Sequence, residues 1–226
     1  MTPYFDRDGI TIYNARCEDV LPSIDPATVD LLLTDPPYGV SLSNHDTTGK
    51  YRRTRSWNVL GDESAEVGQA ALSWGATHDL PTIAFASPMK PWAGTWRQHL
   101  VWDKGPAVGG GGDVSTCWKQ TWELVQVART GKLLGSRDES VLRWHVTPKD
   151  LADHPCQKPV GLMKYLINKV PPRGGVVLDP FMGSGPVAQA CHELCRRYIG
   201  IELVEDYCKV AVSRLAQQTL NFDEAS

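Results

Sequence analysis

The tetrapeptide Asp35-Pro36-Pro37-Tyr38, which directly follows the apolar run Val29–Thr34, constrains the fold of this chain more than any other feature. An apolar run that stops at two prolines indicates a buried parallel strand that ends abruptly, because proline cannot donate a hydrogen bond to a sheet. The strand therefore places a carboxylate and an aromatic ring at its carboxyl end. In open α/β sheets this edge is where ligands bind.

Two later segments follow the same pattern of a strand that ends on an acid. Val176–Leu178 leads into Asp179 and the glycine turn Phe181–Gly185, and Tyr198–Ile201 leads into Glu202. The alternation of strands and helices predicts an α/β fold, a doubly wound and mostly parallel sheet with helices on both faces. A chain of 226 residues suits a single domain with a sizeable core.

The spacing of apolar residues predicts the individual elements. We expect strands at Ile10–Tyr13, Val29–Thr34, Thr82–Ala86, Gln98–Trp102 and Thr121–Ala128. We expect helices at Cys17–Ile24, Ser64–His78, Lys90–Arg97 and from Pro159 to Val170. Two polar or weakly periodic segments, Gly39–Trp57 and Ser136–Asp153, are expected to be loops, and long loops in compact domains are usually functional or disordered.

The composition is that of a soluble globular protein, with 42% hydrophobic and 22% charged residues. No apolar run reaches the roughly 18 residues of a membrane span, and the N-terminus lacks the apolar core of a signal peptide. We therefore expect a cytoplasmic protein without a membrane partner. The six cysteines form no Cys-x-x-Cys pair, so no metal site is expected.

The formal net charge of −3 argues against a uniformly basic surface, but nucleic-acid binding depends on local charge. The densest basic stretch contains Lys50, Arg52, Arg53 and Arg55, with aromatic residues between and after them. It is interpreted as a candidate DNA-contacting segment, with a solvated loop as the alternative.

The glycine turn Phe181–Gly185 allows a ligand to approach the backbone closely, and the helix that follows offers free N–H groups. Glu202 ends the next strand and suits the hydroxyls of a ribose. The turn lacks the third glycine of the dinucleotide fingerprint, which favours a nucleoside cofactor without a pyrophosphate, such as S-adenosylmethionine. The spacing alone leaves a nicotinamide or flavin site open.

With Asp35-Pro36-Pro37-Tyr38 added, the chain resembles the DNA methyltransferases that act on exocyclic amino groups. The catalytic motif precedes the Phe-x-Gly-x-Gly motif, which resembles the circularly permuted group known as the β class. Three further segments resemble family motifs, and they are Leu100–Gly105 with Trp-Asp-Lys, Trp122–Val125 with Glu-Leu, and His154–Pro159 with His-Pro-x-Gln-Lys-Pro.

The resemblance implies a Rossmann-like, circularly permuted fold that binds S-adenosylmethionine. It assigns catalysis to Asp35, Pro36, Pro37 and Tyr38. It assigns cofactor contacts to Cys17, Asp35, Lys158, Asp179, Phe181, Gly183, Ser184, Gly185 and Glu202. Within this set, Glu202 is expected at the ribose, Lys158 at the methionine carboxylate, and Asp179 beneath the glycine turn or at the methionine amino group.

The chemistry of amino methylation suits these catalytic residues. An exocyclic amine is a poor nucleophile, because its lone pair is delocalised into the base. The Asp35 carboxylate and the Pro36 carbonyl can accept its two hydrogens, and preorganised groups of this kind are typically worth about 2.7–4 kcal/mol each. Tyr38 is expected to stack on a base that has left the duplex.

One position departs from the family pattern. The family often has Gly-Asp before the first short helix, where this chain has Ala15 and Arg16, followed by Cys17. We therefore expect the backbone near Cys17 to bond the adenine of the cofactor.

These features predict a site-specific methyltransferase that modifies N6 of an adenine in double-stranded DNA. Serine often replaces the aspartate in the cytosine-N4 subgroup, so Asp35 favours adenine, and a cytosine-N4 enzyme is the alternative. A DNA-binding relative without catalysis is the third reading. Only the segments 39–57 and 136–153 are available for DNA recognition. Specific protein–DNA interfaces bury about 1,000–2,500 Å² of protein, and one core with two short segments offers little surface for that. We therefore also expect a homodimer, in which the second chain adds surface.

Overall fold

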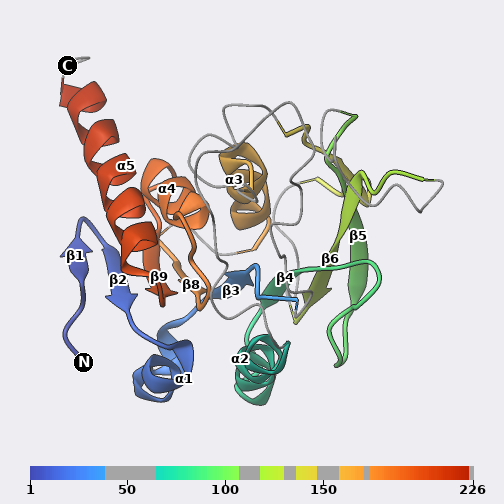
Figure 1. Ribbon diagram of the computed structural model, residues 1–226, viewed down its shortest axis with the longest axis horizontal. Helices are drawn as coiled ribbons and strands as arrows, with labels where there is room; N and C mark the ends of the chain where they lie inside the picture. Colours follow the sequence, from blue (N-terminus) through green and yellow to red (C-terminus); the bar gives the residue numbers. More distant parts are fainter. Residues whose placement is uncertain (39–64, 107–117, 130–135, 147–157, 171–173, 224–226) are drawn as a thin grey trace, which may run out of the picture.

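The computed structural model describes residues 1–38, 65–106, 118–129, 136–146, 158–170 and 174–223 (Figure 1). Within these ranges, nine strands form one sheet in the order β1-β2-β9-β8-β3-β4-β6-β5-β7. The strands are β1 (Phe5–Arg7), β2 (Ile10–Asn14), β3 (Leu31–Thr34), β4 (Thr82–Ala86), β5 (Gln98–Asp103), β6 (Trp122–Ala128), β7 (Val141–Arg143), β8 (Val176–Asp179) and β9 (Arg197–Glu202).

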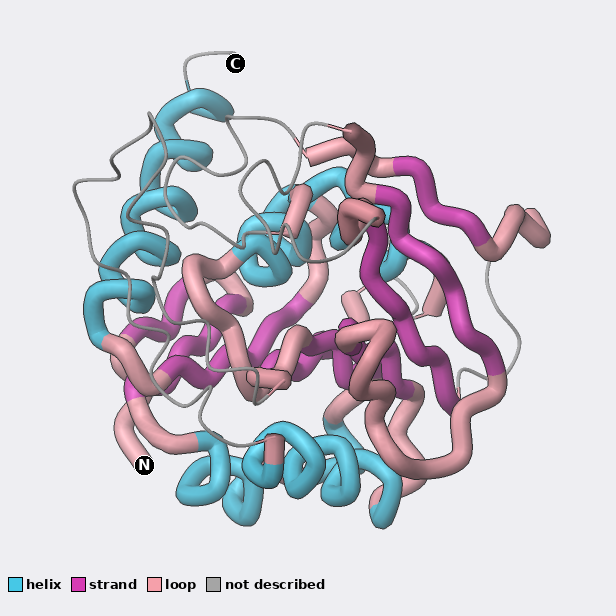
Figure 2. The backbone as a smooth tube through the Cα atoms, turned by 45° about the vertical axis from the view of Figure 1, so that its right-hand side comes forward, coloured by secondary structure: helices cyan, strands magenta, loops and turns pink. Residues whose placement is uncertain are grey.

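Helices cover both faces of this sheet. They are α1 (Cys17–Val20), α2 (Glu66–Thr77), α3 (Val160–Asn168), α4 (Pro186–Glu193) and α5 (Glu205–Asp223). Figures 1 and 2 show α1 and α2 on one side of the strands and α3, α4 and α5 on the other. The predicted mostly parallel, doubly wound α/β architecture is confirmed.

The central strand β3 shows why the sheet needs cover on both faces. All four of its residues are buried, and successive side chains point to opposite faces. Leu31 and Leu33 belong to the hydrophobic cluster under α3 and α4, whereas Leu32 belongs to the cluster on the side of α2. A β-carbon at Gly75 of α2 would come within 2.6 Å of the Leu32 side chain, so a glycine there permits the close helix–sheet contact.

The topology gathers several strand ends at one edge of the sheet. Strands β2, β9, β8, β3 and β4 run parallel to their neighbours in this part of the sheet, so Asp35, Asp179 and Glu202 follow or end strands at the same edge. Strand β6 is antiparallel to both β4 and β5. Its first residues, Trp122 and Glu123, therefore lie at that same edge.

Two predicted segments differ from the structure. The helix expected at Lys90–Arg97 is wrong, because no helix lies there. Long-range bonds hold this segment instead: the backbone N–H of Trp92 donates to Gln126 Oε1 at 2.7 Å, and its indole N–H donates to the Phe85 carbonyl at 2.7 Å. The segment Ser136–Asp153, expected to be a loop, contains β7, which pairs in parallel with β5.

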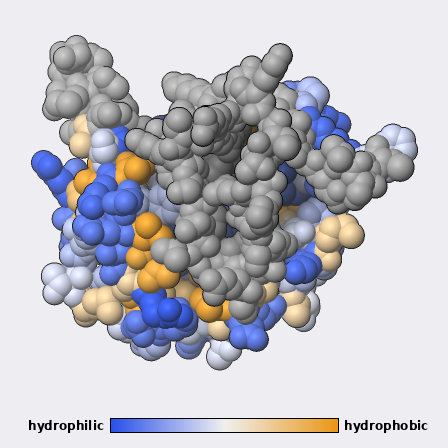
Figure 3. All heavy atoms as spheres, viewed as in Figure 1, coloured by the Kyte–Doolittle hydropathy of each residue, from blue (hydrophilic) through white to orange (hydrophobic). Residues whose placement is uncertain are grey.

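The described surface includes both polar and apolar residues. Hydrophilic residues are interspersed with apolar ones over the described part of the face in Figure 3. Met89 and Trp118 are the most exposed of the large apolar residues among those described, at 84% and 87%. The helices described here include none with the length and apolar character needed to cross a membrane.

Candidate functional site

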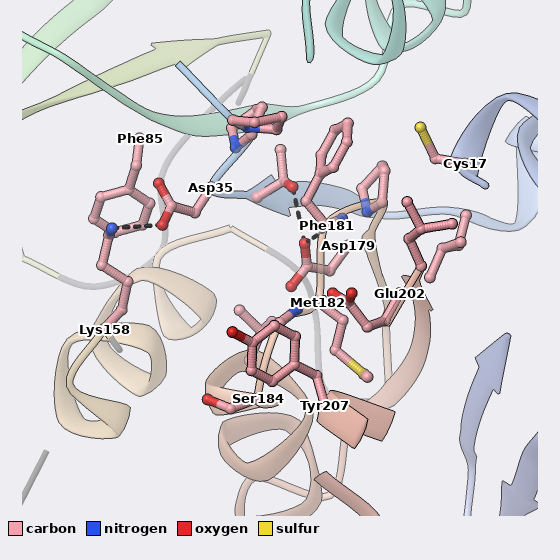
Figure 4. Close-up of a pocket in the computed structure, with 18 of the residues that line it drawn as sticks. Cys17, Asp35, Phe85, Lys158, Asp179, Phe181, Met182, Ser184, Glu202 and Tyr207 are labelled. Carbon is pink, nitrogen blue, oxygen red and sulfur yellow. Dashed lines mark hydrogen bonds and ion pairs between the residues drawn. The ribbon is translucent and has the colours of Figure 1, made fainter. Parts of the chain in front are cut away.

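A cavity of about 450 Å³ opens at the edge where the strand ends meet. This size falls within the range of about 300–1,000 Å³ that small-molecule sites usually have. Figure 4 shows that residues from distant parts of the chain converge on it. The predicted site residues that line it are Cys17, Asp35, Pro36, Pro37, Tyr38, Lys158, Asp179, Phe181, Gly183, Ser184 and Glu202.

Asp35 lies in this cavity with both carboxylate oxygens engaged. Oδ1 accepts a hydrogen bond from the Tyr38 hydroxyl at 2.5 Å, and Oδ2 accepts one from Lys158 Nζ at 2.5 Å. The Tyr38 ring also packs against Trp92, with their centroids 6.2 Å apart. Burial raises the pKa of the Asp35 carboxyl, and the positive charge of Lys158 opposes that rise.

Lys158 contacts more than Asp35. Its Nζ lies 3.2 Å from Glu123 Oε2, 5.1 Å from the Phe85 ring centroid and 5.7 Å from the Trp102 ring centroid. Glu123 is bound in turn by Lys104 Nζ at 3.1 Å. The predicted contact of Lys158 with a methionine carboxylate stays a prediction, and the structure places its ammonium group at two protein carboxylates.

No role is predicted from the sequence for Glu123 or Lys104, although both lie in segments that resemble family motifs. Both line the cavity. A single acid near the start of a mostly apolar strand was the signal that could have identified Glu123. Its position at the site could not be inferred, because it depends on β6 running antiparallel to its neighbours.

The glycine turn is held by the acid that ends the neighbouring strand. Glu202 Oε2 accepts a hydrogen bond from the backbone N–H of Gly183 at 2.8 Å, and Oε1 accepts one from the backbone N–H of Val204 at 2.7 Å. Gly183 has φ of +55°, a left-handed conformation that favours glycine. Burial raises the pKa of the Glu202 carboxyl despite these bonds.

Gly185 has a different surrounding from the other predicted cofactor residues. It is absent from the cavity lining, and it has φ of +81°. A β-carbon there would lie 2.7 Å from the Ala211 β-carbon of α5. In the structure this glycine lets the turn pack against α5.

Asp179 sits beneath the turn and is 2% exposed. Its Oδ1 accepts hydrogen bonds from Thr34 Oγ1 at 2.8 Å and from the Phe181 backbone N–H at 3.2 Å. Its Oδ2 lies 3.4 Å from the Tyr198 hydroxyl. Burial raises the pKa of Asp179 to about 7, so this carboxyl is half protonated near neutral pH.

Cys17 and Lys158 lie at opposite ends of the group of side chains in Figure 4. The Cys17 side chain is 5% exposed, and burial raises the pKa of its thiol to about 12, so it remains a thiol at neutral pH. Arg16, which stands where the family often has an acid, pairs with Glu18 at 2.9 Å. Both ends of the group thus carry charges, with the Arg16–Glu18 pair near the first helix and the Lys158–Asp35 pair at the other end.

The predicted DNA-contacting residues Lys50, Arg52, Arg53 and Arg55 lie outside the described residues, as does the whole of Gly39–Trp57. The same holds for residues 147–153 of the second candidate segment. Their predicted contacts stay predictions.

Comparison with known proteins identifies a family. The model of the N6/N4 methyltransferase family, described as DNA methylase, matches residues 101–213. The chain is similar to Type II methyltransferase M.ScaI of Streptomyces caespitosus, with 42% identity over 272 aligned residues that cover 94% of this chain and 83% of that protein. It is also similar to Type II methyltransferase M2.DpnII of Streptococcus pneumoniae, with 23% identity over 254 residues that cover 94% and 92% of the two chains.

Solved structures share the fold. The M1.HpyAVI-SAM complex matches with a TM-score of 0.65 at 21% identity, covering 91% of this chain and 98% of that one. The PvuII DNA methyltransferase, described as cytosine-N4-specific, matches with a TM-score of 0.61 at 14% identity, covering 91% and 86%.

Proposed function

The chain belongs to the N6/N4 DNA methylase family, and from that premise we propose that it methylates N6 of an adenine flipped out of double-stranded DNA. Its activity at the coarser level is that of an S-adenosylmethionine-dependent DNA methyltransferase. One observation links the proposal to specific residues of this chain. Asp35, which follows β3, and residues of the glycine turn after β8 line the same cavity.

S-adenosylmethionine supplies a methyl group bonded to a positively charged sulfur, and the cavity has the groups to hold such a molecule. Glu202 would accept hydrogen bonds from the ribose hydroxyls while it holds the glycine turn. Phe181 and Ser184 would form the wall and turn on the methionine side, with Asp179 fixing the backbone of Phe181. Cys17 would lie at the end of the cavity that takes the adenine ring of the cofactor.

Asp35 and Pro36 would act on the amine of the target base. The Asp35 carboxylate and the Pro36 carbonyl would each accept one hydrogen of that amine. Although Tyr38 and Lys158 already donate to Asp35, each carboxylate oxygen has a second lone pair and can accept another bond. The amine gains positive charge when it attacks, and these acceptors stabilise that charge. The nitrogen would bond to the methyl carbon as the bond between that carbon and sulfur breaks, which releases S-adenosylhomocysteine. The methylated amine would then lose one proton to solvent.

Asp35 supports adenine as the base, because serine often stands at this position in the cytosine-N4 subgroup. A specific observation keeps cytosine-N4 methylation as the second candidate, since the fold also matches an enzyme described as cytosine-N4-specific. The experiment incubates unmethylated DNA with the protein and methyl-labelled S-adenosylmethionine, and then identifies the labelled nucleosides by mass spectrometry. We expect N6-methyldeoxyadenosine. N4-methyldeoxycytidine supports the second candidate, and DNA binding without label supports an inactive relative.

We also propose the wider organisation implied by the motif order. Residues 1–226 would form one methyltransferase domain of the permuted β class. Two such chains would associate. A specific protein–DNA interface buries about 1,000–2,500 Å² of protein, and one catalytic core with two short recognition segments offers little surface for it. Light scattering with cofactor and with DNA tests the dimer, and a strict monomer that still methylates a defined site contradicts it.

A further inference from the structure

Three charged side chains behind Asp35 come from three different elements. Lys104 follows β5, Glu123 lies at the start of β6, and Lys158 lies two residues before α3. Lys104 Nζ lies 3.1 Å from Glu123 Oε1, and Lys158 Nζ lies 3.2 Å from Glu123 Oε2 and 2.5 Å from Asp35 Oδ2. The charges therefore alternate in sign along a continuous line that ends at Asp35.

This line is shielded from water where it reaches Lys158. The Lys158 side chain is 7% exposed, and those of Lys104 and Glu123 are 14% and 18% exposed. Burial of an ammonium group is costly unless carboxylates pair with it. The ammonium group of Lys158 pairs with two, those of Asp35 and Glu123. The rings of Phe85 and Trp102 lie against the same ammonium group and limit where it can move.

From this geometry we propose that Lys158, held by Glu123 and Lys104, is a positioning residue for the Asp35 carboxylate. This inference rests on the proposed methyltransferase function and adds to it. A bond from Lys158 to Oδ2, together with the bond from Tyr38 to Oδ1, restrains the rotation of the carboxylate. The remaining lone pairs of Asp35 are thereby fixed in direction before the amine of the target base arrives.

The charges around Asp35 also set its protonation. Four ionisable groups interact with Asp35. They are Tyr38, Lys158 just before α3, Glu123 of β6 and Asp179 of β8. Burial raises the pKa of Asp35, Lys158 lowers it and Glu123 raises it. For Glu123, burial acts to raise the pKa, but Lys158 and Lys104 together lower it below its usual value. Glu123 therefore remains a carboxylate that keeps Lys158 in place.

These effects predict opposite results for two substitutions. Lys158→Met removes the attraction that opposes protonation, so Asp35 should bind its proton at higher pH. Glu123→Gln replaces the carboxylate with a neutral amide of similar size and shape. Without the negative charge of Glu123, Asp35 should bind its proton at lower pH. Because methylation needs the Asp35 carboxylate, the acidic limb of the rate profile should move up in the first variant and down in the second.

The experiment measures three quantities in the full chain. Single-turnover methyl transfer as a function of pH gives the acidic limb. Calorimetry with S-adenosylhomocysteine, which carries the methionine-type carboxylate, gives the cofactor affinity. Carbon-13 NMR of labelled aspartate follows the Asp35 carboxyl directly, with its signal assigned by its loss in Asp35→Asn. This last readout requires no activity, so it tests the inference even if the proposed function fails.

Lys164→Met is the matched control, since Lys164 lies on α3 and pairs with Glu193 away from the cavity lining. We expect Lys158→Met to slow transfer about tenfold or more, with the affinity for S-adenosylhomocysteine changed less than about threefold. Lys158→Arg should restore part of the rate, because it keeps the charge. A tenfold or greater loss of affinity, on the order of 1.4 kcal/mol, with no movement of the Asp35 titration would overturn the inference and assign Lys158 to the cofactor carboxylate.

Discussion

Thr34 Oγ1 donates a 2.8 Å hydrogen bond to Asp179 Oδ1, across 145 positions of the chain. Thr34 is the residue before Asp35, and Asp179 is the residue that supports the Phe181 backbone at the glycine turn. The bond therefore ties the strand that carries the catalytic motif to the strand that carries the cofactor turn. The two halves of the site share one buried polar contact.

Thr34→Val should destabilise the fold through this contact. Both side chains are almost fully buried, at 1% and 2% exposure, so the substitution leaves a buried acceptor with one partner fewer. A loss of about 1–3 kcal/mol in the free energy of unfolding is expected from such a change. Urea denaturation measures it. Thr77→Val serves as the control, because Thr77 is exposed on α2 and bonds only within its own helix. Equal effects of the two substitutions contradict the role of the Thr34 bond.

Asp179 should make stability depend on pH. Its pKa is raised from 3.8 to about 7 by burial, so the folded protein binds a proton that the unfolded chain releases between these values. The free energy of unfolding contributed by this group therefore falls as pH rises from about 4 to about 7, and changes little above that.

Asp179→Asn should remove this dependence while keeping an acceptor for Thr34. We expect the stability of the variant to fall less than that of the wild type across the same interval, as measured by urea denaturation at several pH values. The difference should be a few kcal/mol at most, at about 1.4 kcal/mol per pKa unit. Parallel curves for the two proteins would show that Asp179 titrates normally.

Glu202→Ala should weaken cofactor binding more than DNA binding. The ribose hydroxyls would lose a charge-assisted partner, which costs about 1.5–3 kcal/mol. The turn at Gly183 would also lose the acceptor of its N–H group. Calorimetric titration with S-adenosylhomocysteine gives the affinity, and Glu202→Gln tests the contribution of the charge, because its amide oxygen keeps one acceptor for the Gly183 N–H. Unchanged affinity in both variants argues against a ribose contact.

Replacement of Lys50, Arg52, Arg53 and Arg55 with alanine should reduce the salt dependence of DNA binding. These residues follow the catalytic motif in the sequence, and we propose on that ground that they contact DNA phosphates. The slope of log affinity against log salt should fall by up to about 0.9 for each lost phosphate contact in duplex DNA. Fluorescence anisotropy across a salt series measures this slope, and an unchanged slope favours a solvated loop.

The sequence was sufficient to predict the parts of the site that lie at or just after the ends of strands. Three acids at or just after strand ends, Asp35, Asp179 and Glu202, could be placed together because parallel strands end at one edge. The strand Thr82–Ala86 was predicted with its observed bounds, since a continuous apolar run bounded by Pro81 is a strong local signal.

The sequence was not sufficient where long-range contacts decide the structure. Pairing with Gln126 and Phe85 fixes Trp92 outside any helix. The short strands β1 and β7 contain three residues each and depend on their partners β2 and β5 for their bonds. The contact of Glu123 with Lys158 depends on the direction of β6, which no local pattern indicates.

The most direct test compares methyl transfer by the wild type and by Asp35→Ala, using labelled S-adenosylmethionine and duplex DNA under single-turnover conditions. We predict labelled N6-methyldeoxyadenosine from the wild type and a rate at least about 10²-fold lower from the variant, since Asp35 supplies a preorganised acceptor in the transition state. Circular dichroism and S-adenosylhomocysteine binding should show that the variant remains folded. A wild type that labels no nucleoside, or a folded variant that transfers methyl groups within about tenfold of the wild-type rate, would contradict the account.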